Sequence, residues 1–462
     1  VPTGYTPKMA QEEAARCLQC KKPGCVAGCP VGVDIPGFID LIAQGDMTGA
    51  IRNLWSKNAL PAVCGRVCPQ EIQCEGKCVV GKKGEPVAIG NLERFCADYE
   101  REFGTGELPP VGEKTGKKVA VIGSGPAGMA AADQLNRAGH SVTLFEKDRK
   151  AGGLLRYGIP DFKMEKAVID RRLEILEKEG IDFRCGVHVG VDLPASSLFD
   201  DYDALMLCGG ATRRRGLPIP GADLIGVVQA MDFLTQNNRK VAGISFPGDP
   251  ISARGKKVIV IGGGDTGSDC IGTALRQGAS SVVNFEILNR PPAGRPEGQP
   301  WPFWPMRLRT SSSHREGVER FFSIATKAFN ANKKGELKSL VTVDVEWTNS
   351  ANGRRTLKEI PGTEKEWPCD LALLALGFTG SEPTLAEALN LELDPRTNIK
   401  ASAKDYRTAL PGVFVAGDQR RGQSLIVWAI SEGREAAHPV DAYLMGASKL
   451  PLKGEGDLPR VP

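Results

Sequence analysis

Eight cysteines lie between residues 17 and 78 of this 462-residue chain and form two closely spaced groups. The first group is Cys17, Cys20, Cys25 and Cys29, followed by Pro30, and the second is Cys64, Cys68, Cys74 and Cys78, with Pro69 inside it. Thiolates this close together can converge on one point, and four of them are the usual ligands of an iron–sulfur cube. A proline after the fourth cysteine is typical of ferredoxin runs, in which that cysteine binds a second cluster. The array therefore predicts electron transfer in one-electron steps.

Other uses of the cysteines stay open. Thirteen cysteines in the whole chain could form disulfides in a secreted protein or hold structural zinc. Zinc sites usually contain paired C-x2-C units, and here only Cys17 and Cys20 form such a unit. The nucleotide-binding loops described below favour a reducing cytoplasm, so iron–sulfur ligation is the preferred interpretation.

The overall charge and hydrophobicity limit the partners. Lys+Arg 59 against Asp+Glu 55 leaves a net charge of +4, which does not suggest nucleic acid or a membrane surface as a partner. No apolar run approaches the length of a membrane span, and no signal peptide is visible, so we expect a cytoplasmic protein. The chain starts at Val1, so a short leader could precede it.

Two glycine-rich loops each follow a strand pattern and precede a helical pattern. The first, Gly123-Ser124-Gly125-Pro126-Ala127-Gly128, follows a strand pattern at 117–122 and precedes a helical pattern to 138 and a strand at 141–145. The second, Gly262-Gly263-Gly264-Asp265-Thr266-Gly267, follows 256–261 and precedes 268–277 and 281–288. In such loops the glycines permit a tight turn, close approach of backbone N–H groups to a pyrophosphate, and helix–strand packing. The repeat predicts two dinucleotide sites.

The first loop is expected to hold FAD, because a later segment completes it. Glu146, followed by Lys147, ends the next strand pattern, where an acid accepts hydrogen bonds from a ribose diol. Residues 408–418 form a buried strand pattern ending in Gly417-Asp418, which binds the ribityl or pyrophosphate part of FAD in flavoprotein reductases. The helical pattern from 423 to 429, with Ser424 and Leu425 at its start, would direct its N-terminus at the flavin.

The second loop is expected to hold a nicotinamide nucleotide through residues 262–266. Glu286 lies at the distance of an NAD-type acid, but Ile287 and Leu288 suggest that the strand continues past it. Arg290 and Arg295 follow, and an arginine can hold the 2′-phosphate of NADP. We therefore favour NADPH, with Arg290 as the better candidate.

No catalytic side chain is expected. Cys185, Cys208, Cys270 and Cys369 are isolated, and the four histidines have no metal-ligand spacing. Hydride transfer between nicotinamide and flavin needs no such group, because the cofactors carry the chemistry.

Over nearly its whole length the chain resembles the small (beta) subunits of NADPH-dependent glutamate synthase. It is also similar to the N-terminal region of dihydropyrimidine dehydrogenase. The resemblance rests on the cysteine array, both glycine-rich loops, and the segments 90–93, 152–160 and 416–418. The segment 301–305, together with 311–314, is particular to the glutamate synthase branch.

This resemblance implies an interleaved arrangement of the cysteines, where simple proximity in the sequence suggests four plus four. It implies one [4Fe–4S] cluster on Cys17, Cys20, Cys25 and Cys78, and a second on Cys29, Cys68, Cys74 and Glu93. The last position is a glutamine in the dihydropyrimidine dehydrogenase relative, and Cys64 is the alternative ligand. From the 152–160 segment the resemblance also implies Gly153, Leu154 and Arg156 as FAD-binding residues.

The expected fold class is α/β, with two dinucleotide-binding domains, for FAD and NADPH, preceded by a mostly helical iron–sulfur domain. We expect the iron–sulfur domain at 1–112, a charged linker from about 98 to 118, FAD parts at 113–245 and 381–462, and an NADPH domain at 246–380.

The expected function is the electron-input subunit of glutamate synthase. NADPH would be oxidised at FAD, and two clusters would pass the electrons to a large (alpha) subunit in a hetero-oligomer. That subunit would form glutamate from glutamine and 2-oxoglutarate. The alternatives are the same module in a ferredoxin:NADP or pyrimidine reductase, and a scaffold with vestigial cofactors.

Overall fold

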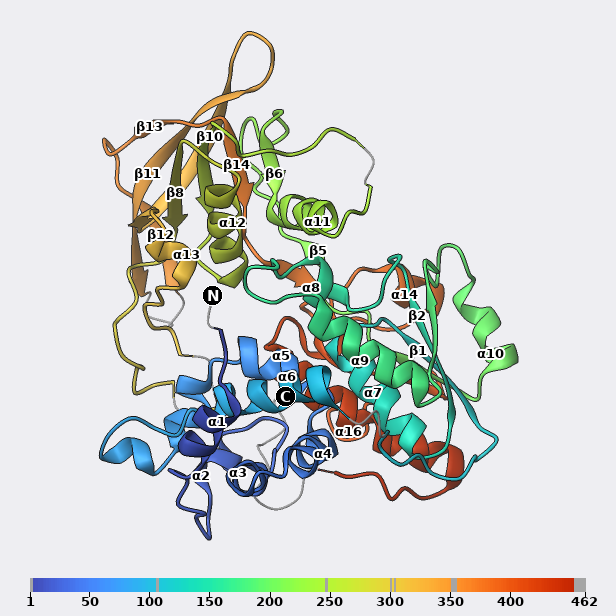
Figure 1. Cartoon of the computed structure of the whole chain (residues 1–462). Coiled ribbons are helices and arrows are strands. Elements are labelled where there is room, and N and C mark those ends of the chain that lie inside the picture. Colours follow the sequence, from blue (N-terminus) through green and yellow to red (C-terminus); the bar gives the residue numbers. More distant parts are fainter. Residues whose placement is uncertain are drawn as a thin grey trace. The chain divides into compact units, whose positions relative to one another are not determined.

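The computed structural model describes residues 3–104, 108–245, 248–299, 301–302, 305–349 and 355–452 (Figure 1). The chain divides into two compact units. Unit 1 contains Val1–Arg156, Asp161–Arg213 and Thr379–Pro462, and unit 2 contains Tyr157–Pro160 and Arg214–Phe378. Phe303 and Trp304, from the 301–305 segment of the resemblance, lie outside the described residues.

The N-terminal part of unit 1 is helical, as the sequence predicts. Its elements are α1 (Pro7–Ala14), α2 (Gly24–Ala27), α3 (Ile35–Gln44), α4 (Met47–Lys57), α5 (Pro61–Val67), η1 (Gln70–Ile72), η2 (Glu75–Lys77), η3 (Val80–Lys82) and α6 (Ile89–Phe103). Asp34 and Asp46 cap α3 and α4 by accepting hydrogen bonds from the third backbone N–H of each helix. Because α6 continues to Phe103, the linker expected from residue 98 starts later than predicted.

A five-stranded parallel sheet forms the rest of unit 1. The strand order is β16 (Val413–Val415), β4 (Ala204–Leu207), β1 (Lys118–Ile122), β2 (Ser141–Glu146) and β3 (Asp182–Cys185). The inner strands are buried and apolar, as parallel strands covered on both faces must be. The helices of this part are α7 (Pro126–Arg137), α8 (Gly153–Tyr157), α9 (Ala167–Lys178), η4 (Ala195–Ser197), α10 (Leu198–Asp201), α14 (Thr384–Ala388), α15 (Asp418–Arg421) and α16 (Ile426–Met445).

The C-terminal segment returns to the first glycine-rich loop. Strand β16 pairs with β4, and α16 packs against α7 with almost no space between the two backbones. A Cβ atom added at Gly433 of α16 would lie 2.0 Å from the carbonyl oxygen of Ala127. The helix that starts at the first loop is therefore held by a helix more than 280 residues later in the chain.

Unit 2 contains a second five-stranded parallel sheet. Its order is β6 (Val227–Gln229), β14 (Leu371–Leu374), β7 (Lys257–Ile261), β8 (Ser281–Glu286) and β9 (Glu319–Phe322). Helices α11 (Ala230–Val241) and α12 (Asp265–Arg276) share one buried apolar cluster with this sheet. Because β6 pairs with β14, residues 214–245 belong to unit 2, whereas the sequence placed them with the first FAD part.

An antiparallel sheet that the sequence did not predict follows β9 within unit 2. It consists of β10 (Ile324–Ala331), β11 (Leu337–Asn349), β12 (Arg355–Glu359) and β13 (Lys365–Pro368), with β11 paired to the other three. Trp367 of β13 packs edge-on against Phe285 and Phe321 of the parallel sheet. The remaining elements are α13 (Ser312–Arg315), β5 (Arg213–Arg214) and β15 (Phe378–Gly380). None of the described helices combines the length and apolar character needed to cross a bilayer.

Candidate functional site

Cys17, Cys20, Cys25 and Cys78 lie together, although Cys78 belongs to the second group in the sequence. All four line one hollow, whose other walls include Ile35 and Ile39 of α3. Burial raises the pKa of the Cys25 thiol to about 11, and the charges of Cys78 and Cys17 contribute to the rise. Four thiolates in an apolar hollow are the donor set of a [4Fe–4S] cluster.

A second set contains Cys29, Cys68 and Cys74. Burial raises the pKa of Cys74 well above its usual value, and the charges of Cys29 and Glu93 add to this effect. Burial also raises the pKa of Cys29 to about 12. The side chains are thus grouped in space as the resemblance implies, and their roles as ligands remain a prediction.

Both candidates for the eighth ligand lie at this second set. Glu93 of α6 is buried, which raises the pKa of its carboxyl group to about 8, and its Oε1 accepts a hydrogen bond of 2.8 Å from Asn58 Nδ2. Its charge is felt by Cys29, Cys68 and Cys74. The Cys64 thiol is hydrogen bonded with the Cys68 thiol, and this bond is the largest cause of the raised pKa of Cys68. Among the described residues, no three such donors surround the position of a single metal ion.

The first glycine-rich loop has the geometry of a pyrophosphate cradle. Gly123 has φ +103°, and a Cβ there would lie 2.5 Å from the carbonyl oxygen of Cys208. A Cβ at Gly128 would lie 1.8 Å from the carbonyl oxygen of Gly123, so helix and loop are in direct backbone contact. At Gly125 a Cβ would meet no atom within 4 Å. The space in front of Gly125 and the N-terminus of α7 is therefore open to an anionic group.

Glu146 ends β2 and turns back onto this loop. Its Oε2 accepts hydrogen bonds from the backbone N–H and the hydroxyl of Ser124, the first at 3.1 Å, and its Oε1 accepts one from the N–H of Asp148. The acid is therefore held beside the open space, where a ribose would lie. The adjacent Lys147 is exposed to solvent.

The segment after β2 completes the wall of the first loop. Gly152 donates its N–H to Ser124 Oγ at 2.8 Å, and a Cβ at Gly153 would lie 3.1 Å from Gly125 Cα. Arg156 is buried and donates to the Ala151 carbonyl at 2.6 Å and to Asp170 at 2.5 Å. Leu154 is partly exposed. Gly153 thus lies at the cradle, whereas Arg156 is engaged in contacts that hold the loop.

Gly417 and Asp418 reach the same loop from the C-terminal segment. A Cβ at Gly417, which has φ +68°, would lie 2.6 Å from the Cβ of Ala127. Burial raises the pKa of Asp418 to about 6, and one of its oxygens accepts a hydrogen bond of 2.5 Å from Ser424 Oγ. Leu425 is the N-cap residue of α16, which starts at Ile426 rather than near residue 423.

The second glycine-rich loop repeats this geometry in unit 2. Gly262 has φ +119°, and a Cβ at Gly267 would lie 2.3 Å from the carbonyl oxygen of Gly262. At Gly264, as at Gly125, a Cβ would meet no atom within 4 Å. Asp265 and Thr266 form the first turn of α12, and Gly263 is covered by the carboxylate of Glu286.

The charged residues after β8 differ from the expectation in one respect. Strand β8 ends at Glu286 and does not continue through Ile287 and Leu288. Arg290 is exposed, with its guanidinium 5.9 Å from the centre of the Phe322 ring. Arg295 donates to the Gln299 carbonyl at 2.7 Å. The pairing partner of Glu286 is Arg320 of β9, which no local sequence pattern indicated.

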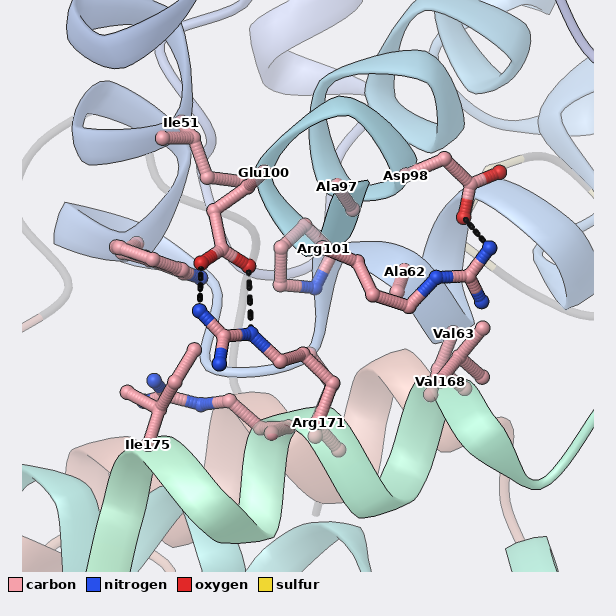
Figure 2. A pocket seen from close by; sticks show the side chains of 14 residues that line it. Ile51, Ala62, Val63, Ala97, Asp98, Glu100, Arg101, Val168, Arg171 and Ile175 are labelled. Atoms are coloured by element: carbon pink, nitrogen blue, oxygen red, sulfur yellow. Dashed lines mark hydrogen bonds and ion pairs between the residues drawn. The ribbon is translucent and has the colours of Figure 1, made fainter. Parts of the chain in front are cut away.

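Polar contacts hold the helical segment against the first dinucleotide-binding sheet. Arg171 of α9 donates two hydrogen bonds to Glu100 of α6, one of them at 2.5 Å (Figure 2). The pair lies at the edge of a small pocket between α4, α5, α6 and α9, whose apolar lining includes Ile51, Val168 and Ile175.

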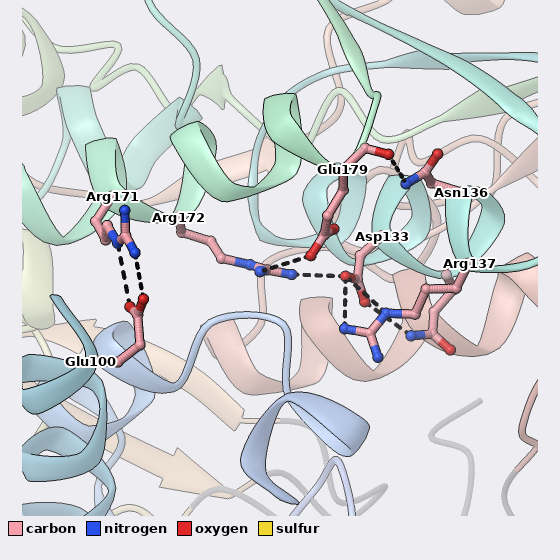
Figure 3. A network of polar contacts seen from close by, with 8 residues as sticks. Glu100, Asp133, Asn136, Arg137, Arg171, Arg172 and Glu179 are labelled. Carbon is pink, nitrogen blue, oxygen red and sulfur yellow. Dashed lines mark hydrogen bonds and ion pairs between the residues drawn. The ribbon is translucent and has the colours of Figure 1, made fainter. Parts of the chain in front are cut away.

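The next residue of α9 extends this contact into the interior. Arg172 donates to Asp133 of α7 at 2.7 Å and lies 3.7 Å from a carboxylate oxygen of Glu179 (Figure 3). Its guanidinium also lies 5.6 Å from the centre of the Trp55 ring of α4. Helix α9 therefore ties the helical cysteine segment on one side to the helix of the first loop on the other.

Comparison with known proteins gives matches over almost the whole chain. A family model described as dihydropyrimidine dehydrogenase domain II, 4Fe-4S cluster, matches residues 1–105, and one described as pyridine nucleotide-disulphide oxidoreductase matches residues 117–433. The glutamate synthase [NADPH] small chain of Mycobacterium tuberculosis is 48% identical over 96% of this chain and 90% of its own. That of Bacillus subtilis is 43% identical over 97% and 93%. The glutamate synthase [NADH] of Schizosaccharomyces pombe is 43% identical over 96% of this chain but only 22% of its own length.

Among solved structures, FprA from Mycobacterium tuberculosis in complex with NADPH is similar, with a TM-score of 0.57 and 21% identity. The similarity covers 71% of this chain and 85% of that one. It supports the arrangement of two parallel α/β sheets after a separate N-terminal segment.

The Arg171–Glu100 pair should contribute more to stability than an exposed ion pair. Their side chains are only 21% and 10% exposed, so the charges are less screened than at the surface. In a double-mutant cycle of Arg171→Ala and Glu100→Ala, we expect a coupling energy of about 1 kcal/mol or more in urea unfolding. The control is the exposed Lys178–Glu174 pair of the same helix, which should couple less. Equal coupling in the two cycles would contradict this assignment.

Proposed function

The chain belongs to the glutamate synthase small-chain family, and on that basis we propose that it oxidises NADPH and passes the electrons to a separate large chain. The large chain would use them to make glutamate from glutamine and 2-oxoglutarate. The observation that carries the proposal is the presence in one chain of two pyrophosphate cradles and two groups of cysteines. Its thirteen unpaired cysteines suit a reducing compartment such as the cytoplasm.

FAD is assigned to the first loop. Gly123, Gly125, Pro126, Ala127 and Gly128 would face the pyrophosphate, with the N-terminus of α7 stabilising its charge. Glu146 and Lys147 would lie at the ribose, and Gly153, Leu154 and Arg156 would form the wall. Gly417, Asp418, Ser424 and Leu425 would close the site from the C-terminal side. When bound, FAD supplies the conversion of a two-electron hydride transfer into single-electron transfers.

NADPH is assigned to the second loop. Gly262, Gly263, Gly264, Asp265 and Thr266 would hold its pyrophosphate at the N-terminus of α12. Arg290 is exposed beside Phe322 and would bind the 2′-phosphate. Arg295 is already hydrogen bonded to Gln299 and would have a smaller role.

Two [4Fe–4S] clusters are assigned to the two groups of cysteines. The first would be held by Cys17, Cys20, Cys25 and Cys78, which share one hollow. The second would be held by Cys29, Cys68, Cys74 and Glu93, with Cys64 as the alternative to Glu93. As thiols these side chains have raised pKa values, so binding of iron would have to offset the cost of buried thiolates.

The function itself is tested by separating the two half-reactions. We expect the purified chain to oxidise NADPH with an artificial dye as acceptor, and to form no glutamate until the large chain is added. Cys17→Ser should block glutamate formation in the complex, while the dye reaction persists because it needs only the flavin. Glutamate formation by the isolated chain, or full coupled activity after loss of the clusters, would disprove the proposal.

The assignment of cofactors to loops is tested by matched substitutions. Because a Cβ at Gly125 or Gly264 meets no protein atom within 4 Å, valine at either position should leave the fold intact and obstruct only the dinucleotide. Gly125→Val should yield a protein without flavin. Gly264→Val should retain flavin absorbance but lose its bleaching by NADPH. The reverse pattern would exchange the two assignments.

The cluster ligands are tested by iron and sulfide analysis. If both clusters contain four irons, each chain should hold about eight iron and eight acid-labile sulfide ions. Glu93→Ala should lower the iron content toward about four per chain, whereas Cys64→Ala should leave it unchanged. Cys96→Ala, at another buried cysteine of α6, is the control. Loss of iron in Cys64→Ala but not in Glu93→Ala would assign Cys64 as the ligand.

A further inference from the structure

Glu286 in unit 2 occupies the position that Glu146 has in unit 1. In the first sheet, Ile122 of β1 pairs with Phe145 of β2, and Glu146 follows. In the second sheet, Ile261 of β7 pairs with Phe285 of β8, and Glu286 follows. Both acids therefore stand at the end of the second strand of a dinucleotide-binding unit, where an acid normally accepts hydrogen bonds from the adenosine ribose.

The two acids are held in different ways. Glu146 accepts hydrogen bonds from the backbone N–H and hydroxyl of Ser124. The corresponding loop residue in unit 2 is Gly263, which has no hydroxyl group. The Glu286 carboxylate lies over its backbone, about 2.1 Å from where a Cβ of Gly263 would be. Its Oε1 accepts a hydrogen bond of 2.7 Å from Arg320 Nη2, and the two side chains are only 13% and 14% exposed.

Arg320 is itself held in place by β9 and its surroundings. Its Nη1 donates to the Arg309 carbonyl at 2.8 Å, and its guanidinium lies 5.2 Å from the centre of the Phe322 ring. The Arg290 guanidinium lies 5.9 Å from the same ring. The acid at the expected ribose position thus has a fixed cation on one side and a second, exposed cation nearby.

We propose that Arg320 determines nucleotide specificity by neutralising Glu286, so that the second loop accepts the 2′-phosphate of NADPH beside an acid that would otherwise repel it. A carboxylate and a phosphate placed together without a counter-charge repel each other strongly. With Arg320 paired to Glu286, the local charge is balanced, and Arg290 is left to bind the phosphate. Without Arg320, Glu286 still accepts hydrogen bonds from the 2′-hydroxyl of NADH. This inference rests on the assignment of the nicotinamide nucleotide to the second loop.

The test compares Arg320→Met, Arg320→Lys, Glu286→Gln and the double variant Arg320→Met/Glu286→Gln in the full chain. NADP⁺ and NAD⁺ binding is measured by calorimetry, and flavin reduction by NADPH and NADH is measured by stopped flow. Arg320→Met should weaken NADP⁺ binding about tenfold or more, which corresponds to about 1.4 kcal/mol, and change NAD⁺ binding less than about threefold. Arg320→Lys should restore much of the loss, because it keeps the charge.

The double variant distinguishes charge balance from simple loss of a phosphate ligand. If Arg320 acts by neutralising Glu286, removing both charges should recover most of the NADP⁺ affinity that Arg320→Met loses. Glu286→Gln alone should weaken NAD⁺ and spare NADP⁺. Arg276→Met is the control, because Arg276 forms a similar ion pair with Glu316 at the other end of α12.

Equal losses of NADP⁺ and NAD⁺ affinity in Arg320→Met, or no recovery in the double variant, would overturn the inference. Neither result would affect the proposed function, provided that the unaltered chain binds NADP⁺ and its flavin is reduced by NADPH. Failure of the proposed function would instead appear in the unaltered chain, as an absence of nucleotide binding that Gly264→Val does not change.

Discussion

A pyrophosphate can approach backbone N–H groups only where the chain carries no side chain, and both units of this protein are organised around that constraint. At Gly125 and Gly264 the backbone faces open space, whereas Gly123, Gly128, Gly262 and Gly267 bring strand, loop and helix into direct contact. Buried parallel strands hold each loop from behind, and a helix N-terminus stabilises the anion in front. The same local solution occurs twice, and the parts that differ around it separate a flavin site from a nicotinamide site.

Electron transfer from flavin to clusters also requires the helical segment to stay close to the first loop. Helix α9 provides this connection through two consecutive arginines. Arg171 binds Glu100 of the helical segment, and Arg172 binds Asp133 on the helix of the first loop while its guanidinium lies near Trp55. Because these charges are largely buried, removal of one partner would leave the other unpaired in a dry environment. Cysteine segment and flavin half are therefore coupled by more than apolar packing.

The parts of the structure that depend on local pattern were predictable from the sequence. Both glycine-rich loops, their flanking strands and helices, and the helical character of the cysteine segment follow from periodicity and glycine spacing. The end of β8 at Glu286 was wrongly predicted, because Ile287 and Leu288 extend the apolar pattern without extending the strand. Arg320 could not be found, since it reaches Glu286 only through pairing of β8 with β9, after more than thirty intervening residues. The boundary at 214 and the antiparallel sheet depend on similar long-range pairing, as does the meeting of Cys78 with Cys17.

The late return of the chain to the first loop has a consequence for biosynthesis. Gly417, Asp418 and α16 leave the ribosome after every residue of unit 2 has been made. The elements of the second loop are therefore complete on the nascent chain while the first cradle still lacks its closing wall. A ribosome-bound intermediate could fold unit 2 and bind nucleotide, but it would acquire stable flavin only near release. Truncations before residue 417 should consequently be flavin-free for a topological reason, even when every residue of the first loop is present.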